Sequence, residues 1–102
     1  MKFDDVCETV TGPHGGYYVA AYAARSDPGL AAGVTAYYKV CLRQPASYFD
    51  AEDPLHKGYA GTFVDLQDAL RCALDSATAA ARRLPSPAQL AYWREVCAMN
   101  HL

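Results

Sequence analysis

The sequence predicts an α+β fold: an antiparallel meander of three to four strands, then two C-terminal helices, the first packed on one sheet face. Three observations indicate this fold. Residues 34–43 alternate between the two sides of a pleated strand. Residues 66–84 repeat apolar side chains at helical spacing. The motif Ser86-Pro87-Ala88-Gln89 begins a second helix. The 102 residues are enough for one domain, 1–102, with a single core.

The strands are expected at residues 3–11, 17–24, 34–43 and 59–64. Residues 12–16 are a turn because they are rich in glycine and proline, and residues 25–29 form a second turn for the same reason. The long neighbouring strands 17–24 and 34–43 are expected to pair antiparallel. Residues 44–58 are expected to form a long loop, which Tyr48 and Phe49 attach to the body.

The alternation in residues 34–43 assigns one face to the core and the other to solvent. The expected core side chains are those of Val34, Ala36, Tyr38, Val40 and Leu42. The expected solvent-facing side chains are those of Thr35, Tyr37, Lys39, Cys41 and Arg43.

Both helices carry recognisable start signals. Asp65 is a good N-cap, and Asp68 favours the positive end of the helix dipole. Pro85 ends the first helix, whose apolar stripe consists of Leu66, Ala69, Leu70, Ala73, Leu74, Ala77 and Leu84. The second helix is expected to cover an edge or end of the core with an arc of Leu90, Trp93, Val96 and Cys97.

Composition narrows the classes of protein. The formal net charge is −2, whereas proteins that grip a phosphate backbone usually carry a basic excess, so nucleic acid is an unlikely partner. No apolar run approaches the ~20 residues that span a bilayer, and no membrane partner is expected. The four cysteines lie far apart with no export signal before them. They are expected to be free thiols of a cytoplasmic protein.

The segment Gly61-Thr62-Phe63-Val64-Asp65-Leu66-Gln67-Asp68-Ala69 is similar to the strand-to-helix joint of many short, uncharacterised bacterial proteins of unknown function. The lack of isoleucine and the excess of arginine over lysine fit a high-GC proteobacterial source. The element order also resembles the latter part of double-stranded-RNA-binding domains. Those domains carry lysines where this chain has Leu66-Gln67-Asp68, so the resemblance implies a fold and no RNA-binding activity.

Candidate catalytic and metal-binding groups are weakly marked. His14 is a candidate general base, as any histidine is, but no recognisable nucleophile motif lies beside it. The glycines around it are interpreted as a plain turn. Asp50, Glu52 and Asp53 do not have the spacing of a calcium loop and are interpreted as a solvated acidic loop. The sequence therefore predicts a protein that is not an enzyme, with no cofactor and no metal site.

The eight tyrosines carry the best functional signal. Tyrosine and arginine are enriched in binding hot spots, whereas cross-strand packing is the alternative role for tyrosines on a sheet. The candidate partner-binding surface consists of Tyr18, Tyr22, Tyr37, Lys39 and Arg43. We therefore expect a non-catalytic protein-binding or regulatory module, which binds a protein partner or associates with itself. Three alternatives stay open: an acidic inhibitor or immunity-type protein that uses the acidic loop, a small enzyme, and an RNA-binding domain.

Overall fold

A computed structural model of the chain describes residues 6–25, 33–52 and 54–100. It confirms the α+β fold. The elements, in chain order, are β1 (Val6–His14), β2 (Tyr17–Arg25), β3 (Val34–Cys41), β4 (His56–Phe63), α1 (Leu66–Arg83) and α2 (Pro87–Asn100). The expected strand start at residues 3–5 and most of the expected turn at 25–29 lie outside the described residues.

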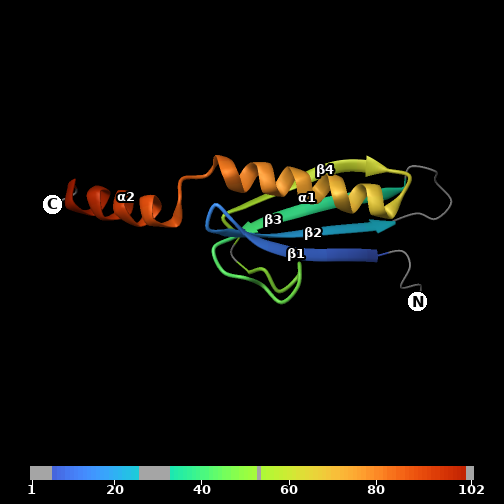
Figure 1. The fold of residues 1–102 in the computed structure, drawn as a ribbon, viewed down its shortest axis with the longest axis horizontal. Helices are drawn as coiled ribbons and strands as arrows, with labels where there is room; N and C mark the ends of the chain where they lie inside the picture. Colours follow the sequence, from blue (N-terminus) through green and yellow to red (C-terminus); the bar gives the residue numbers. More distant parts are fainter. Residues whose placement is uncertain (1–5, 26–32, 53, 101–102) are drawn as a thin grey trace.

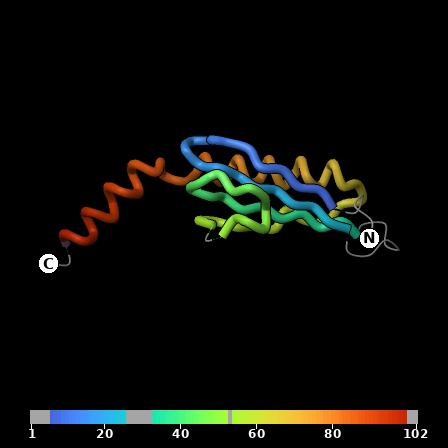
Figure 2. The backbone as a smooth tube through the Cα atoms, turned by 90° about the horizontal axis from the view of Figure 1, so that it is seen from below, coloured from blue at the N-terminus to red at the C-terminus, as the bar shows by residue number. Residues whose placement is uncertain are grey.

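The four strands form one antiparallel sheet in the order β1-β2-β3-β4, with each strand beside its neighbour in the chain. Helix α1 runs along one face of this sheet (Figure 1). The connection between β3 and β4 lies across the opposite face (Figure 2). The sheet therefore has an α1-covered face and a second face that carries most of the tyrosines.

The first hairpin turns at two glycines rather than at residue 12. Strand β1 continues through Pro13 to His14, which pairs with Tyr17. Gly15 and Gly16 have φ angles of 60° and 92°, and two successive positive φ values are typical of the type I′ turn that joins antiparallel strands. The glycine-rich segment is therefore a turn, as expected, but a shorter one.

Strands β3 and β4 differ at their ends from the sequence prediction. Strand β3 stops at Cys41, so Leu42 is exposed and is not part of the core. Strand β4 begins at His56, three residues earlier than expected, because the pairing with β3 extends to Val40 opposite His56. Gly58 makes this possible, since a Cβ there would come within 2.3 Å of the Tyr38 ring that lies over it.

A β-bulge in β4 divides its side chains between the two faces. Ala36 pairs with Gly61, but the next residue of β3, Tyr37, pairs with Tyr59. Gly61 has a φ of +124°, a conformation that L side chains rarely adopt. Because of the extra residue, Tyr59 lies on the tyrosine-bearing face whereas Phe63 packs into the core under α1.

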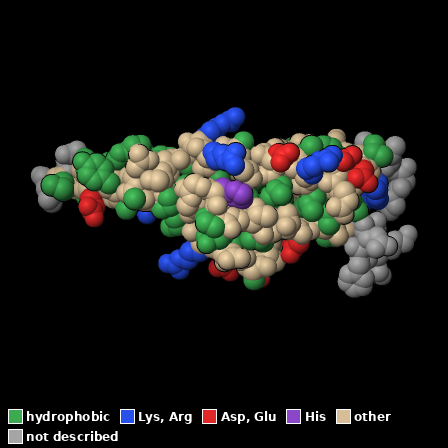
Figure 3. All heavy atoms as spheres, viewed as in Figure 1, with side chains coloured by type: hydrophobic (Ala, Val, Ile, Leu, Met, Phe, Trp, Pro, Cys, Tyr) green, Lys and Arg blue, Asp and Glu red, His purple; other side chains and the backbone are tan. Residues whose placement is uncertain are grey.

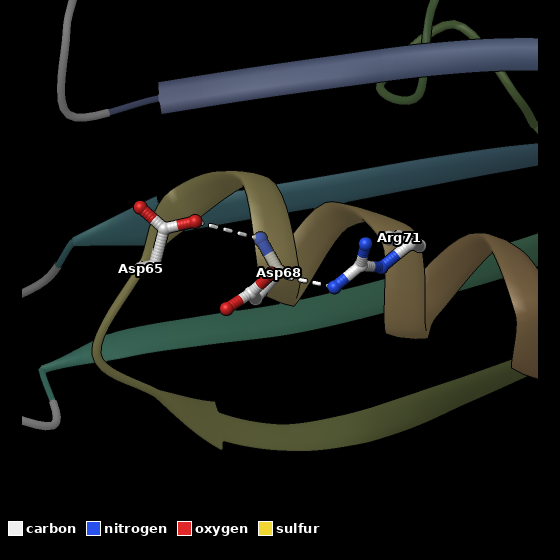
Figure 4. Close-up of polar contacts among 3 residues, drawn as sticks. All are labelled: Asp65, Asp68 and Arg71. Carbon is white, nitrogen blue, oxygen red and sulfur yellow. Dashed lines mark hydrogen bonds and ion pairs between the residues drawn. The ribbon is translucent and has the colours of Figure 1, made fainter.

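Helix α1 begins and packs as the sequence predicts. The Asp65 Oδ2 atom accepts a hydrogen bond of 3.0 Å from the backbone N–H of Asp68, and Arg71 pairs with Asp68 at 2.6 Å (Figure 4). The helix contacts the sheet mainly through alanines at a four-residue spacing. These buried residues are Ala69, Ala73, Ala77 and Ala81. Small side chains let α1 lie close to the alanine-rich strand β2 and to Ala36 of β3.

Helix α2 does not cover an edge or end of the core, so this part of the sequence prediction is wrong. Its capping box forms, because the Ser86 and Gln89 side chains each accept from the other residue's backbone N–H, at 3.2 and 3.0 Å. The helix nevertheless extends away from the sheet (Figure 1), and only Leu90 of the expected arc packs on the core. Trp93 and Cys97 are exposed, and Val96 is half-buried.

Candidate protein-binding surface

Two aromatic side chains hold the β3–β4 connection on the tyrosine-bearing face. We call residues 42–52, 54 and 55 the β3–β4 loop. Tyr48 stacks on Tyr22 of β2, with ring centroids 5.2 Å apart and an interplanar angle of 19°. Phe49 meets the same Tyr22 ring edge-on at 4.9 Å. The expectation that Tyr48 and Phe49 attach this loop to the body is confirmed.

Lys39 anchors the same loop from β3. Its ammonium lies 4.2 Å from the ring centroid of Tyr48 and donates hydrogen bonds to the carbonyl oxygens of Tyr48 (2.9 Å) and Ala51 (3.4 Å). Burial raises the pKa of the Tyr48 hydroxyl, and the neighbouring Tyr37 and Tyr22 hydroxyls raise it further. A positive charge that satisfies two carbonyls and an aromatic ring is a strong local tether.

The loop divides the five predicted binding residues. Tyr22 and Lys39 lie beneath it and are occupied by internal contacts. Arg43 is beyond the end of β3, where it lines a hollow of about 360 Å³ beside Asp50. Tyr18 lies at the start of β2 and is half-buried. Of the four residues on the strands, Tyr37 is the most open to solvent, with 37% of the residue exposed. The five residues therefore do not form one continuous open surface.

Tyr59 is the exposed aromatic residue that sequence reasoning missed. Its ring centroid lies 5.5 Å from that of Tyr37, and 57% of the residue is exposed. Tyr59 reaches this position through the bulge at Gly61, so simple alternation along β4 could not place it. A glycine inside a strand pattern was the available signal, because such glycines mark bulges.

The groove between α1 and β4 is a second hollow, on the other face of the sheet. It has a volume of about 470 Å³ and is lined by Tyr38, His56, Ala79, Arg83 and neighbouring residues. The Tyr38 hydroxyl lies 3.2 Å from the His56 Nε2 atom. This pair closes one side of the groove.

The other candidate groups remain separate. His14 lies in β1, with its Nε2 atom 2.9 Å from the Thr11 hydroxyl. Asp50 and Glu52 are exposed on the β3–β4 loop, while Asp53 lies outside the described residues. Within the part of the chain that the structure describes, no three His, Cys, Asp or Glu side chains gather into a metal-binding group.

All four cysteines are free thiols. Burial raises the pKa of the Cys7 thiol, and the nearby Asp65 carboxylate adds to the effect. Burial also raises the pKa of the Cys41 thiol, and the positive charge of Lys39 partly offsets this increase. Cys41 is buried although its strand position was expected to face solvent, because the β3–β4 loop folds over that end of the sheet.

Comparison with known proteins gives no relative from which a function could be transferred. No protein-family model, no curated protein and no solved structure matches this chain. In the described ranges, none of the helices has both the length and the apolar character needed to cross a membrane.

Proposed function

We propose that this chain is a non-catalytic protein-binding module, and that its partner contacts the open part of the tyrosine-bearing face around Tyr37 and Tyr59. The observation that carries the proposal is the exposed aromatic pair formed by these two side chains. Tyrosine combines apolar area with a hydroxyl that can form hydrogen bonds, which is why it recurs at the centres of protein interfaces.

The surroundings of the pair favour a rigid binding surface. Tyr37 and Tyr59 project from two hydrogen-bonded strands, and the β3–β4 loop is fixed beside them by its contacts with Tyr22 and Lys39. A surface that is ordered before binding loses little conformational entropy when a partner arrives. The pair is therefore prepared to act as an anchor without rearrangement.

The face is a better contact surface than the free edge of β4. An edge strand can recruit another strand through its unpaired backbone groups, but a bulge twists the edge and discourages such pairing. The bulge between Tyr59 and Gly61 lies in the middle of β4. We therefore assign recognition to the side chains of the face rather than to backbone pairing. The four free thiols suit a reducing compartment, and we place the protein in the cytoplasm on that ground.

The test is capture and titration with single substitutions. The immobilised chain is incubated with lysate of its source organism, and each retained protein is purified and titrated by calorimetry. We expect Tyr37→Ala and Tyr59→Ala each to weaken binding about tenfold or more, as truncating a hot-spot residue does. Tyr92→Ala, on the distant helix α2, is the matched control. A partner that binds both β-sheet variants as tightly as the unaltered chain, or no specific partner at all, contradicts the proposal.

An acidic inhibitor is the second candidate function. Asp50 and Glu52 are exposed on a loop that Lys39 and Tyr22 hold in place, so their carboxylates are presented in a fixed arrangement. Such a loop could imitate the phosphates that a basic nuclease or toxin binds. The double substitution Asp50→Lys and Glu52→Lys is expected to abolish binding to a basic partner, and added salt to weaken it. Binding that is indifferent to both changes eliminates this candidate.

A further inference from the structure

Helix α2 is mostly apolar yet lies largely outside the core. Only four of its fourteen residues are polar: Gln89, Arg94, Glu95 and Asn100. Tyr92, Trp93 and Met99 are 63%, 51% and 70% exposed. Hydrophobic side chains cover much of the visible surface of α2 at the left of Figure 3. Large apolar side chains exposed together commonly mark a surface that a partner covers, and the body of this chain does not cover those of α2.

The linker to α1 directs α2 away from its own body. Leu84 has an extended conformation (φ −74°, ψ 147°), and Tyr17 donates a hydrogen bond from its hydroxyl to the carbonyl of Pro85. Pro87 packs so closely on Gly16 that a Cβ at Gly16 would lie 2.8 Å from the proline ring. The linker between α1 and α2 is therefore held at Pro85 by Tyr17 and at Pro87 by Gly16. These contacts hold the three linker residues in the conformation that directs α2 away from α1.

One side of α2 begins in contact with the core and continues beyond it. Leu90 packs on the cluster formed by Tyr17, Val40, Ala77 and their neighbours. Three and seven residues further, Trp93 and Cys97 lie on the same side of the helix as Leu90, because a helix completes a turn every 3.6 residues. Tyr92 lies on the opposite side, since two residues turn the helix by about 200°.

We propose that α2 is a self-association helix, and that the stripe of Leu90, Trp93 and Cys97 packs antiparallel against the same stripe of a second copy. A twofold axis between Trp93 and Arg94 pairs Leu90 with the partner's Cys97. It also places each Arg94 guanidinium beside the partner's Trp93 ring. Arg94 is the one charged residue that borders the stripe, and arginine over tryptophan is a favourable cation–π arrangement. The stripe is thus complementary to itself, as a twofold interface requires.

The size of the body selects the antiparallel orientation. The molecule measures 59 × 22 × 21 Å, and packed helices lie about 8–10 Å apart. Two parallel α2 helices would bring both bodies to the same end, where widths of more than 20 Å do not fit at that spacing. Antiparallel helices place the bodies at opposite ends. In this arrangement Met99 reaches the partner's Ala88, at the start of the partner's α2.

The available area predicts a weak dimer. A stable interface buries about 800 Å² on each partner, whereas a fully enclosed aromatic side chain contributes about 150–250 Å². The exposed half of Trp93 therefore supplies roughly 100 Å², and one stripe of a helix about 21 Å long stays below the stable class. We therefore expect a dimer whose dissociation constant is in the micromolar range or weaker.

The first test is sedimentation equilibrium of the full chain over about 5 µM to 1 mM. We expect a monomer–dimer equilibrium for the unaltered protein, and a shift of at least tenfold toward monomer for Trp93→Ala. Trp93→Glu should be monomeric throughout. Tyr92→Ala, a truncation on the opposite side of the same helix, should leave the equilibrium unchanged. Circular dichroism checks that every variant is folded. A monomer at all concentrations, or a dimer that survives Trp93→Glu, overturns the proposal.

The second test fixes the orientation by disulfide formation in a Cys72→Ser background under mild oxidation. Leu90→Cys should give a dimer linked between positions 90 and 97, identified by peptide mapping. The chain with its natural Leu90 should not link through Cys97, because an antiparallel pair separates the two Cys97 residues by about 10 Å along the axis. A direct link between the two Cys97 residues in that chain would indicate a parallel pair and overturn the model of contact. Tyr37→Ala is the control in both tests. Loss of the dimer on Tyr37→Ala, but not on Trp93→Ala, would assign self-association to the sheet surface instead.

Discussion

The ammonium of Lys39 lies over the ring of Tyr48 and donates to the carbonyl oxygen of the same residue. The two residues are nine positions apart in sequence and join β3 to the loop that follows it. Through this contact the loop shields Tyr22 and leaves Tyr37 and Tyr59 as the open aromatic pair. The contact between Lys39 and Tyr48 therefore determines which tyrosines stay exposed, although neither residue belongs to the proposed binding surface.

Removing the charge of Lys39 should loosen this loop. Lys39→Met keeps most of the apolar stem and deletes the ammonium, so it removes the cation–π contact and two hydrogen bonds to carbonyls. We expect a loss of about 1–2 kcal/mol in the free energy of unfolding, measured by urea denaturation. We also expect faster backbone hydrogen exchange in residues 47–51. Lys57→Met, at the exposed lysine paired with Lys39 across the sheet, is the control. An equal effect of the two substitutions contradicts the tether.

Two glycines of β4, Gly58 and Gly61, should each resist substitution by alanine, for different reasons. Gly61→Ala places a side chain at a φ of +124°, although its Cβ meets nothing closer than the Phe63 ring at 3.6 Å. We expect a cost of about 1–3 kcal/mol from backbone strain alone. Gly58→Ala, without a positive φ, should fail for a different reason, because its Cβ would overlap the Tyr38 ring.

Thermal unfolding combined with a second substitution separates the two causes. Replacing the Tyr38 ring with the smaller leucine side chain, in Gly58→Ala/Tyr38→Leu, should recover part of the stability that Gly58→Ala loses. The same Tyr38→Leu change should rescue nothing in Gly61→Ala. Rescue of both glycine variants, or of neither, would show that this explanation of the bulge is wrong.

The features that sequence patterns predicted correctly depend on residues close together in the chain. The Asp65 cap, the Ser86–Gln89 capping box and the alanine spacing of α1 follow from contacts within about one or two helical turns. The cover over Tyr22 could not be predicted in the same way. It depends on where a loop of more than ten residues comes to lie on a sheet, which alternation along β3 does not contain.

Helix α2 shows the same limit from another side. Its apolar composition correctly indicated residues that need to be buried, but the sequence did not say against what. The extended Leu84 and the contact between Tyr17 and Pro85 direct α2 away from the sheet. The packing on the core that we expected from the arc of Leu90, Trp93, Val96 and Cys97 therefore does not form beyond Leu90. The composition of α2 thus indicated that its apolar side chains need to be buried. The conformation of the linker determines that most of them are not buried against the sheet or α1 of the same chain.

The close approach of α1 to the sheet depends on small side chains. Ala73 is fully buried and packs in the cluster that includes Ala21 and Ala36. Ala73→Leu adds a volume that this site cannot hold, and we expect a loss of about 1–3 kcal/mol, seen as a lower midpoint of thermal unfolding. Ala79→Leu makes the same chemical change on the exposed side of α1 and should cost less than about 0.5 kcal/mol. Similar losses at the two positions would mean that α1 does not lie close to the strands.

Stability should fall in alkaline solution because of buried thiols and hydroxyls. Burial raises the pKa of Cys7, Cys41, Tyr17 and Tyr48 above their ordinary values of about 9 and 10. Between the ordinary pKa and the raised one, the unfolded chain has lost a proton that the folded chain keeps. The unfolded state binds fewer protons there, so the free energy of unfolding decreases as pH rises. The stabilising contribution is complete below about pH 9 and is lost as pH passes through the raised values.

Tyr17 is the residue at which this dependence can be measured, because its hydroxyl is enclosed and donates to Pro85. Urea denaturation at pH 8, 9, 10 and 11 should give a free energy of unfolding that declines above about pH 9. Each group contributes a slope of at most about 1.4 kcal/mol per pH unit. Tyr17→Phe should lower the stability at pH 8 and make the decline between pH 10 and 11 shallower, since one ionisable group has been removed. Tyr92→Phe, at an exposed position, is the control. A decline that is equally steep with Tyr17 and with Phe at this position would contradict the assignment.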